Sequence, residues 1–161
     1  MKCKQAMAIA FLLAITVVSC KFRSALNFNE AMAAKEKDIA PAIQTAEIRI
    51  KEFYTAGKFD SVAAIGERME KLLQQKVDEI EAMKAPAGKE GENFKAACVR
   101  AFESVKAVYS MYKRIGKATT AEARQKQLDN VQQIVKNKEE AVEDMQAAQK
   151  RFAAENGFKI Q

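Results

Sequence analysis

The chain of 161 residues contains no histidine and no tryptophan. Histidine is the commonest metal ligand and the commonest general acid or base, so its absence argues against most metal centres and hydrolytic enzymes. Glycine and proline are also scarce, with six and two residues. So few turn-forming residues exclude collagen-like and all-β folds, and three cysteines are too few for a disulfide-rich scaffold.

In place of these residues the chain has 29 alanines and many long charged side chains. Alanine is the best helix former, and arginine, lysine and glutamate follow it closely. The composition therefore predicts an all-α protein with one domain.

The first 19 residues form a segment of their own. Lys2 and Lys4 precede the apolar run Ala6–Val18, in which only Thr16 is polar. A basic start followed by a short apolar run is typical of a signal peptide. A transmembrane helix fits less well, because a helix of this length spans about 20 Å and the apolar core of a membrane is about 30 Å thick.

The run ends in Val17-Val18-Ser19-Cys20, which resembles a bacterial lipobox. The resemblance implies cleavage before Cys20 and attachment of acyl chains to that residue. Several chains, each contributing about 0.8 kcal/mol per buried methylene, anchor a protein stably where one chain does not. We therefore expect a signal peptide at 1–19 and lipidation of Cys20. The alternative is an ordinary signal peptide that ends beside an unmodified cysteine.

Cleavage at this point would leave 142 residues and one further thiol, Cys98. Cys98 falls on an apolar helical stripe and has no histidine to activate it, so we expect a buried core residue and not a nucleophile. The net charge would fall from +6 to +4, because the leader holds two lysines and no acidic residue. Acidic and basic residues alternate along 117–161, so we expect no nucleic-acid partner.

Four segments carry apolar residues at helical spacing, at about 28–56, 59–84, 92–115 and 120–155. Short connections between amphipathic helices predict an antiparallel up-down four-helix bundle that occupies 28–161. The residues expected to face inward are Met32, Ile39, Ile43, Ala46, Ile50, Phe53, Phe59, Val62, Ile65, Gly66, Met69, Leu72, Leu73, Val77, Ile80, Met83, Phe94, Cys98, Ala101, Val105, Val108, Tyr112, Ile115, Leu128, Val131, Val135, Val142, Met145 and Phe152.

Several local features refine this layout. Residues 20–27 lack a sustained period and are expected to form a tether between the lipid and the bundle. Pro41 interrupts a stripe that keeps its phase on both sides, which predicts one helix kinked at Pro41.

Gly57, Gly116 and Gly157 are expected to end helices, and Thr119-Thr120-Ala121-Glu122 is typical of a capping box. Lys138 and Gln149 fall on the inward stripe of the last segment and loosen it.

No pattern in the sequence predicts catalysis, a cofactor or a metal site. Glu67 with Glu70, and Glu140 with Glu143, are carboxylate pairs one turn apart, but solvated helix faces carry such pairs routinely. The segment Gly57-Lys58-Phe59-Asp60 resembles the turn of a tetratricopeptide unit, yet no second copy follows 34 residues later. We expect a protein that is not an enzyme, and no small-molecule substrate is evident.

A candidate partner contact consists of Tyr109, Tyr112, Lys113 and Arg114. Aromatic rings beside basic side chains are frequent in binding patches for proteins and polymers. Tyr54 is expected near the same end of the bundle. The alternative is that the three tyrosines are amphipathic core residues.

The leader, the four-helix layout and the run Gln149–Phe158 together resemble the small all-helical surface lipoproteins of Gram-negative bacteria, whose biochemical role is unassigned. The resemblance implies a lipid-anchored protein of the cell envelope. Lys21 stands where an aspartate would signal inner-membrane retention in the best-known sorting scheme, so we expect the outer membrane, on either face. The protein would act by binding an envelope protein or surface ligand, or as a structural component. The alternative is a periplasmic chaperone-like or accessory subunit, with Phe102 and Met111 as surplus apolar residues.

Overall fold

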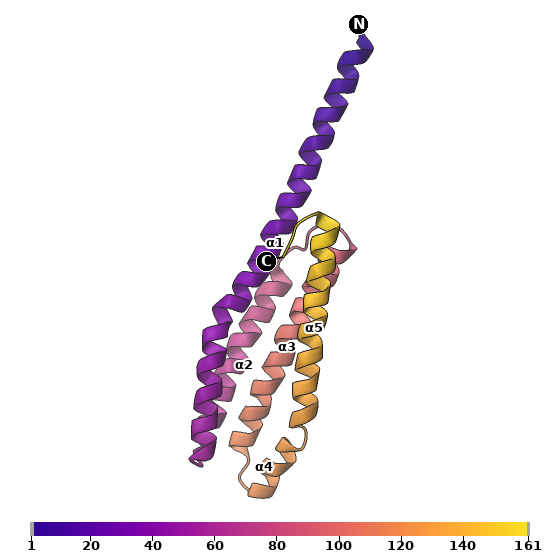
Figure 1. The fold of residues 1–161 in the computed structure, drawn as a ribbon. Coiled ribbons are helices and arrows are strands. Elements are labelled where there is room, and N and C mark those ends of the chain that lie inside the picture. The colour runs from indigo at the N-terminus through magenta and orange to yellow at the C-terminus, as the bar shows by residue number, and fades with distance from the viewer. Residues whose placement is uncertain (1, 161) are drawn as a thin grey trace.

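The computed structural model describes the backbone of residues 2–160 and the side chains of residues 21–160. Over these residues the chain is all-helical, with no strand. The helices are α1 (Lys2–Thr55), α2 (Phe59–Ala82), α3 (Lys89–Lys117), α4 (Ala121–Leu128) and α5 (Val131–Asn156). The second half of α1, α2, α3 and α5 form a helical bundle, and the short α4 lies at the end of the bundle between α3 and α5 (Figure 1).

Two of the three glycines expected to end helices do so. Gly57 follows α1 with φ of +69°, and Gly157 follows α5 with φ of +74°. After α1 the amide of Lys58 donates to the carbonyl of Phe53 at 2.8 Å, which satisfies a carbonyl that has no partner within the helix. These turns are local, so the sequence alone predicts them correctly.

Gly116 does not end a helix, contrary to expectation. It is a buried residue inside α3, where a Cβ atom would lie 2.4 Å from the amide nitrogen of Ala63 and 2.5 Å from the carbonyl oxygen of Phe59. Gly66 of α2 meets α3 in the same way, since its Cβ would lie 2.6 Å from the amide nitrogen of Lys113. The two glycines let the backbones of α2 and α3 approach closely.

The segment expected as one helix over 120–155 is divided into α4 and α5. The amide side chain of Asn130 donates to the backbone carbonyl of Lys126 at 3.4 Å. Such side chains compete with the helical backbone and favour an interruption. The cap of α4 is also one residue later than expected, because the hydroxyl of Thr120 accepts the amide of Ala123.

Two expectations concern α1. Residues 20–27 were expected to form a tether outside the bundle. In the structure residues 21–27 are helical and Ala25 is fully buried. Ala25 extends the stripe of Phe28 and Met32 towards the N-terminus, which explains why packing begins earlier than predicted. The helix is continuous through Pro41, as expected, and the bend at that residue stays a prediction.

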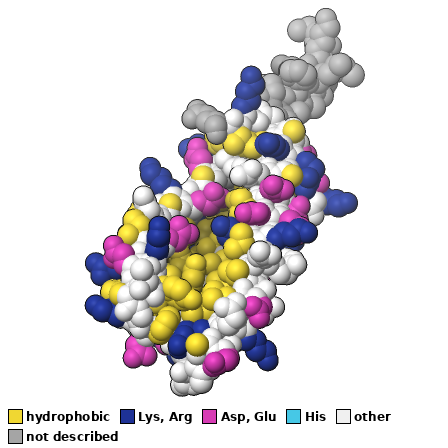
Figure 2. All heavy atoms as spheres, turned by 60° about the horizontal axis from the view of Figure 1, so that its bottom comes forward, with side chains coloured by type: hydrophobic (Ala, Val, Ile, Leu, Met, Phe, Trp, Pro, Cys, Tyr) yellow, Lys and Arg dark blue, Asp and Glu magenta, His cyan; other side chains and the backbone are white. Residues whose placement is uncertain are grey.

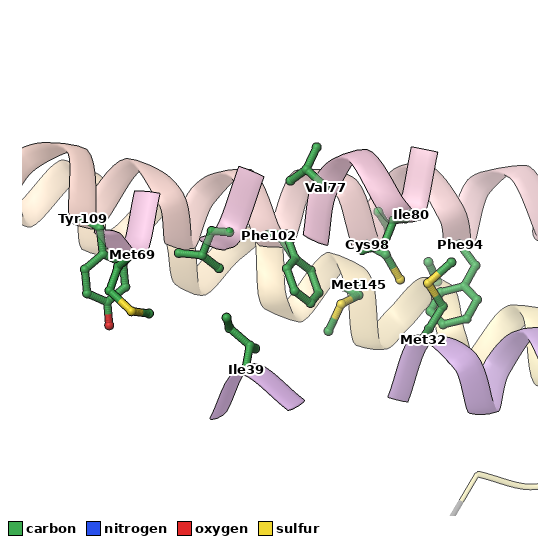
Figure 3. Close-up of a cluster of buried hydrophobic side chains, with 14 of the residues drawn as sticks. Met32, Ile39, Met69, Val77, Ile80, Phe94, Cys98, Phe102, Tyr109 and Met145 are labelled. Atoms are coloured by element: carbon green, nitrogen blue, oxygen red, sulfur yellow. The ribbon is translucent and has the colours of Figure 1, made fainter. Parts of the chain in front are cut away.

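The core joins α1, α2, α3 and α5. At one end, Phe28 of α1, Phe94 of α3 and Phe152 of α5 meet, with the rings of Phe94 and Phe152 stacked at 5.4 Å between centroids. Figure 3 shows how side chains from these helices continue this core along the bundle, among them Met69 and Cys98. Most of the inward residues predicted for α2 and α3 are buried, and Cys98 is buried as expected.

Candidate functional site: an apolar groove between α1 and α5

Helices α1 and α5 are in close contact near one end of the bundle. There Phe28 and Phe152 have ring centroids 6.0 Å apart, and the side-chain amide of Gln149 donates to Asn29 at 2.8 Å. Further towards α4 an apolar groove separates the two helices, beginning at Glu36. The helices therefore form a wedge that is closed at the phenylalanine cluster and open towards α4.

The groove encloses about 350 Å³ and takes its lining from four helices. Its floor comes from α2 and α3, including Phe102, and its walls come from α1 and α5. Ile39 of α1 lies across the groove from Phe102 and Met145 (Figure 3). Figure 2 shows hydrophobic side chains gathered in a hollow with charged side chains around it. The lining residues are Glu36, Ile39, Ala40, Ile43, Gln44, Glu47, Leu73, Ala101, Phe102, Val105, Val142 and Met145.

The α5 wall explains why the groove is open. Val131, Val135 and Val142 were predicted to face a closed core, but they are half-buried, and no side chain between 131 and 142 is fully buried. The interruption before Val131 and the polar Lys138 on the stripe leave this half of α5 without the contacts that its second half makes. Of these three valines, Val142 lines the groove, so apolar surface that would be core in a closed bundle faces the groove at that residue.

Only Glu36 and Glu47 carry charge among the lining residues, and both are on α1. Among residues 21–160, no lysine or arginine forms an ion pair with either carboxylate. Glu36 is accessible to solvent, yet the apolar walls beside it remove part of its hydration and raise its pKa. The groove thus combines apolar walls with two unneutralised negative charges.

Two tyrosines stand close to the Glu47 end. Tyr109 is buried and its hydroxyl donates to the carbonyl of Ile43 at 3.4 Å, while Tyr112 is half-buried with its ring centroid 6.2 Å from that of Tyr109. Burial raises the pKa of both phenols, and the carboxylate of Glu47 raises it further. The hydrogen bond to Ile43 places the hydroxyl of Tyr109 one helical turn from Glu47 along α1.

The expected partner contact is not one exposed patch. Tyr109 is buried, Lys113 pairs with Glu70, and Arg114 donates to Gln127 at 3.1 Å. The four residues therefore divide between the core, an ion pair and the surface. Tyr54, expected nearby, packs instead against Phe59 with ring centroids 5.6 Å apart.

Three further expectations concern the carboxylate pairs, a membrane-spanning helix and Cys20. Glu67 pairs with Lys71 and Lys117, so this carboxylate has a structural partner, and the described residues contain no cluster of three or more metal-ligating side chains. No helix in the described part of the chain is both long and apolar enough to cross a membrane. The side chain of Cys20 lies outside the described residues.

Cys98 should be chemically inert in the folded protein. Desolvation raises the pKa of its thiol to about 12, so almost no thiolate exists at neutral pH. We expect a bulky maleimide to label Cys98 at pH 8 only as fast as the protein unfolds, and rapid labelling of the native protein would contradict this. Cys98→Ala should lower the free energy of unfolding by about 1 kcal/mol, because it leaves a small cavity.

No family model matches the sequence, and searches of curated proteins and of solved structures find no match either. The groove was not predicted from the sequence. Its one sequence signal is a pair of polar residues on the inward stripe, Lys138 and Gln149. Gln149 bonds to Asn29 of α1, and Lys138 belongs to the half of α5 that has no fully buried side chain.

Proposed function

We propose that the protein is a lipid-anchored binding protein of the bacterial cell envelope, and that the groove between α1 and α5 is its binding site. The main observation that supports a binding role is the groove itself. Nine of its twelve lining residues are apolar, and its volume of about 350 Å³ lies within the range of small-molecule pockets. A catalytic role of the groove has no comparable support, because its lining residues include no activated nucleophile and no acid–base pair.

The proposed architecture is an up-down four-helix bundle held at a membrane by acyl chains on Cys20. In it, Pro41 bends α1, because it lacks the amide that would bond to the carbonyl of Lys37. Pro41 lies in the stretch of α1 between Glu36 and Glu47 that lines the groove. A bend at this point would direct the second half of α1 away from α5 and keep the groove open.

The anchor is tested by replacing Cys20 with serine. Serine cannot accept the thioether-linked lipid. We therefore expect the Cys20→Ser protein either to appear in the soluble fraction or to accumulate as the uncleaved precursor. Membrane fractionation detects release from the membrane, and intact-mass measurement detects the uncleaved precursor. An unchanged membrane fraction with unmodified Cys20 in the parent protein would contradict the anchor. Cys98→Ser is the matched control and should leave fractionation unchanged.

The groove is tested by filling its mouth. Ala40 is an exposed residue on the α1 wall, so a larger side chain can cover the groove without disturbing the core. We expect Ala40→Phe to weaken binding of the uncharged probe N-phenyl-1-naphthylamine by about tenfold, since it displaces the probe from apolar surface. Ala34→Phe, at an exposed site on α1 outside the groove, should bind normally. Equal binding by the two variants would place the apolar site elsewhere.

The alternative of a chaperone-like subunit loses part of its support. It relied on Phe102 and Met111 as apolar residues at the surface, and both are buried. Large apolar side chains that are exposed in the described chain, Phe22, Ile48 and Tyr54, are spread along α1. The groove remains an apolar surface for a partner of either kind.

A further inference from the structure

We propose that the groove binds a single-chain amphiphile with a cationic head, such as a long-chain amine or quaternary ammonium compound. The alkyl chain would lie between α1 and α5, and the head would sit at the Glu47 end beside Tyr112. This inference rests on the proposed function, because it names the ligand class of the same groove.

The shape of the groove favours one elongated apolar chain. Its charged residues on α1, Glu36 and Glu47, are eleven residues apart, which corresponds to about 16 Å along a helix. Between them the lining side chains are apolar except Gln44, and Ile39, Phe102 and Met145 face one another across the hollow. At the Glu36 end the groove adjoins a second hollow, so charge, and not a closed wall, decides which end receives the head.

Charge at the Glu47 end selects the head group. Four acidic residues of α1 and α2 form ion pairs, for example Glu79 with Lys35 at 2.6 Å. Glu47 has no such partner among the described residues, and its carboxylate is close enough to Tyr109 and Tyr112 to raise the pKa of both phenols. A cation placed there would neutralise Glu47 close to the aromatic pair of Tyr109 and Tyr112, since Tyr109 bonds to Ile43 of the groove lining. Carboxylates and aromatic rings together recognise quaternary ammonium groups.

The other end of the groove is less suitable for a cation. Glu36 also borders an adjoining hollow at the C-terminal end of α5, and Lys150 and Lys159 line that hollow. Their positive charges oppose a cationic head near Glu36 and leave Glu47 as the preferred position. An anionic head at the Glu47 end would meet an unneutralised carboxylate, and no lysine or arginine belongs to the groove lining.

The test compares two amphiphiles with the same chain and opposite heads. Dodecyltrimethylammonium and dodecanoate, both below the concentration at which they form micelles, are titrated calorimetrically into the full chain carrying Cys20→Ser. We expect the ammonium compound to bind about tenfold more tightly, from one ion pair and one cation–π contact in a partly desolvated site. Glu47→Gln should reduce this preference to about twofold or less, whereas Glu52→Gln, on an exposed face of α1, should leave it unchanged.

The possible outcomes separate this inference from the proposed function. Tight binding of both amphiphiles with no preference, or a preference that survives in Glu47→Gln, would overturn the head-group assignment and leave the apolar groove intact. Failure of both amphiphiles and of the uncharged naphthylamine probe would overturn the binding function itself. If a basic amphipathic peptide bound and neither amphiphile did, the groove would be a protein-docking site and the amphiphile proposal would be wrong. Circular dichroism establishes that the variants are folded.

Discussion

Replacing Gly116 with alanine should lower the free energy of unfolding by about 2–3 kcal/mol, a large effect for one methyl group. The added Cβ would lie 2.4 Å from the backbone nitrogen of Ala63 and 2.5 Å from the backbone oxygen of Phe59, far inside van der Waals contact. Backbone atoms cannot rotate away as a flexible side chain can, so α2 and α3 must move apart. Urea denaturation followed by circular dichroism measures the loss.

The matched control is Gly57→Ala. A Cβ at Gly57 meets no atom within 4 Å, and its cost comes only from the positive φ, about 1 kcal/mol. The two variants thus separate helix contact from backbone conformation. If Gly116→Ala proved neutral, or stabilising by the roughly 1 kcal/mol that alanine gains over glycine in an open helix, the close approach of α2 and α3 would be wrong.

Replacing Phe152 with alanine should cost about 3–5 kcal/mol, the usual range for a phenylalanine lost from a well-packed core. Its ring stacks on Phe94 and meets Phe28 and Phe158 edge to face, so it joins α1, α3, α5 and the C-terminal residues at one point. Its loss should also release the contact that closes the wedge between α1 and α5. We expect faster hydrogen exchange around residues 25–32, in addition to the lower unfolding midpoint.

Phe22→Ala is the control for this variant. Phe22 lies at the edge of the same aromatic group, 6.4 Å from Phe158 between centroids, but it is 41% exposed. Truncation of an exposed ring should change stability by about 0.5 kcal/mol or less. Similar losses in the two variants would mean that Phe152 is not the residue that joins the helices.

The parts of the fold that depend on neighbouring residues could be predicted from the sequence. An unbroken apolar stripe from Phe94 to Ile115 identifies α3 and places Cys98 in the core, and a glycine with positive φ is the expected end of α1. These inferences need only the helical period and the conformational freedom of glycine. They hold whichever helices surround the segment.

The groove and the close helix contacts depend on tertiary arrangement and could not be predicted in this way. A stripe containing Val135 and Val142 shows that the residues are apolar, but not whether a facing helix reaches them. Gly116 reads as a helix end from its own neighbours, and its position opposite Ala63 becomes apparent only when α2 is placed beside α3. For Tyr109 the sequence leaves both a binding patch and the core open, and the position of Ile43 of α1 next to its hydroxyl decides between them.

The most direct test of the binding role is photochemical labelling of the protein in its native membrane. A dodecyl ammonium compound with a diazirine on its chain is irradiated with the membranes, and cross-linked peptides are identified by mass spectrometry. Our account predicts saturable labelling on the groove walls and floor, around Ile43, Phe102 and Val142, and strong reduction by Ala40→Phe but not by Ala34→Phe. Labelling confined to the outer faces of α2 and α3, or labelling that Ala40→Phe leaves unchanged, would contradict it.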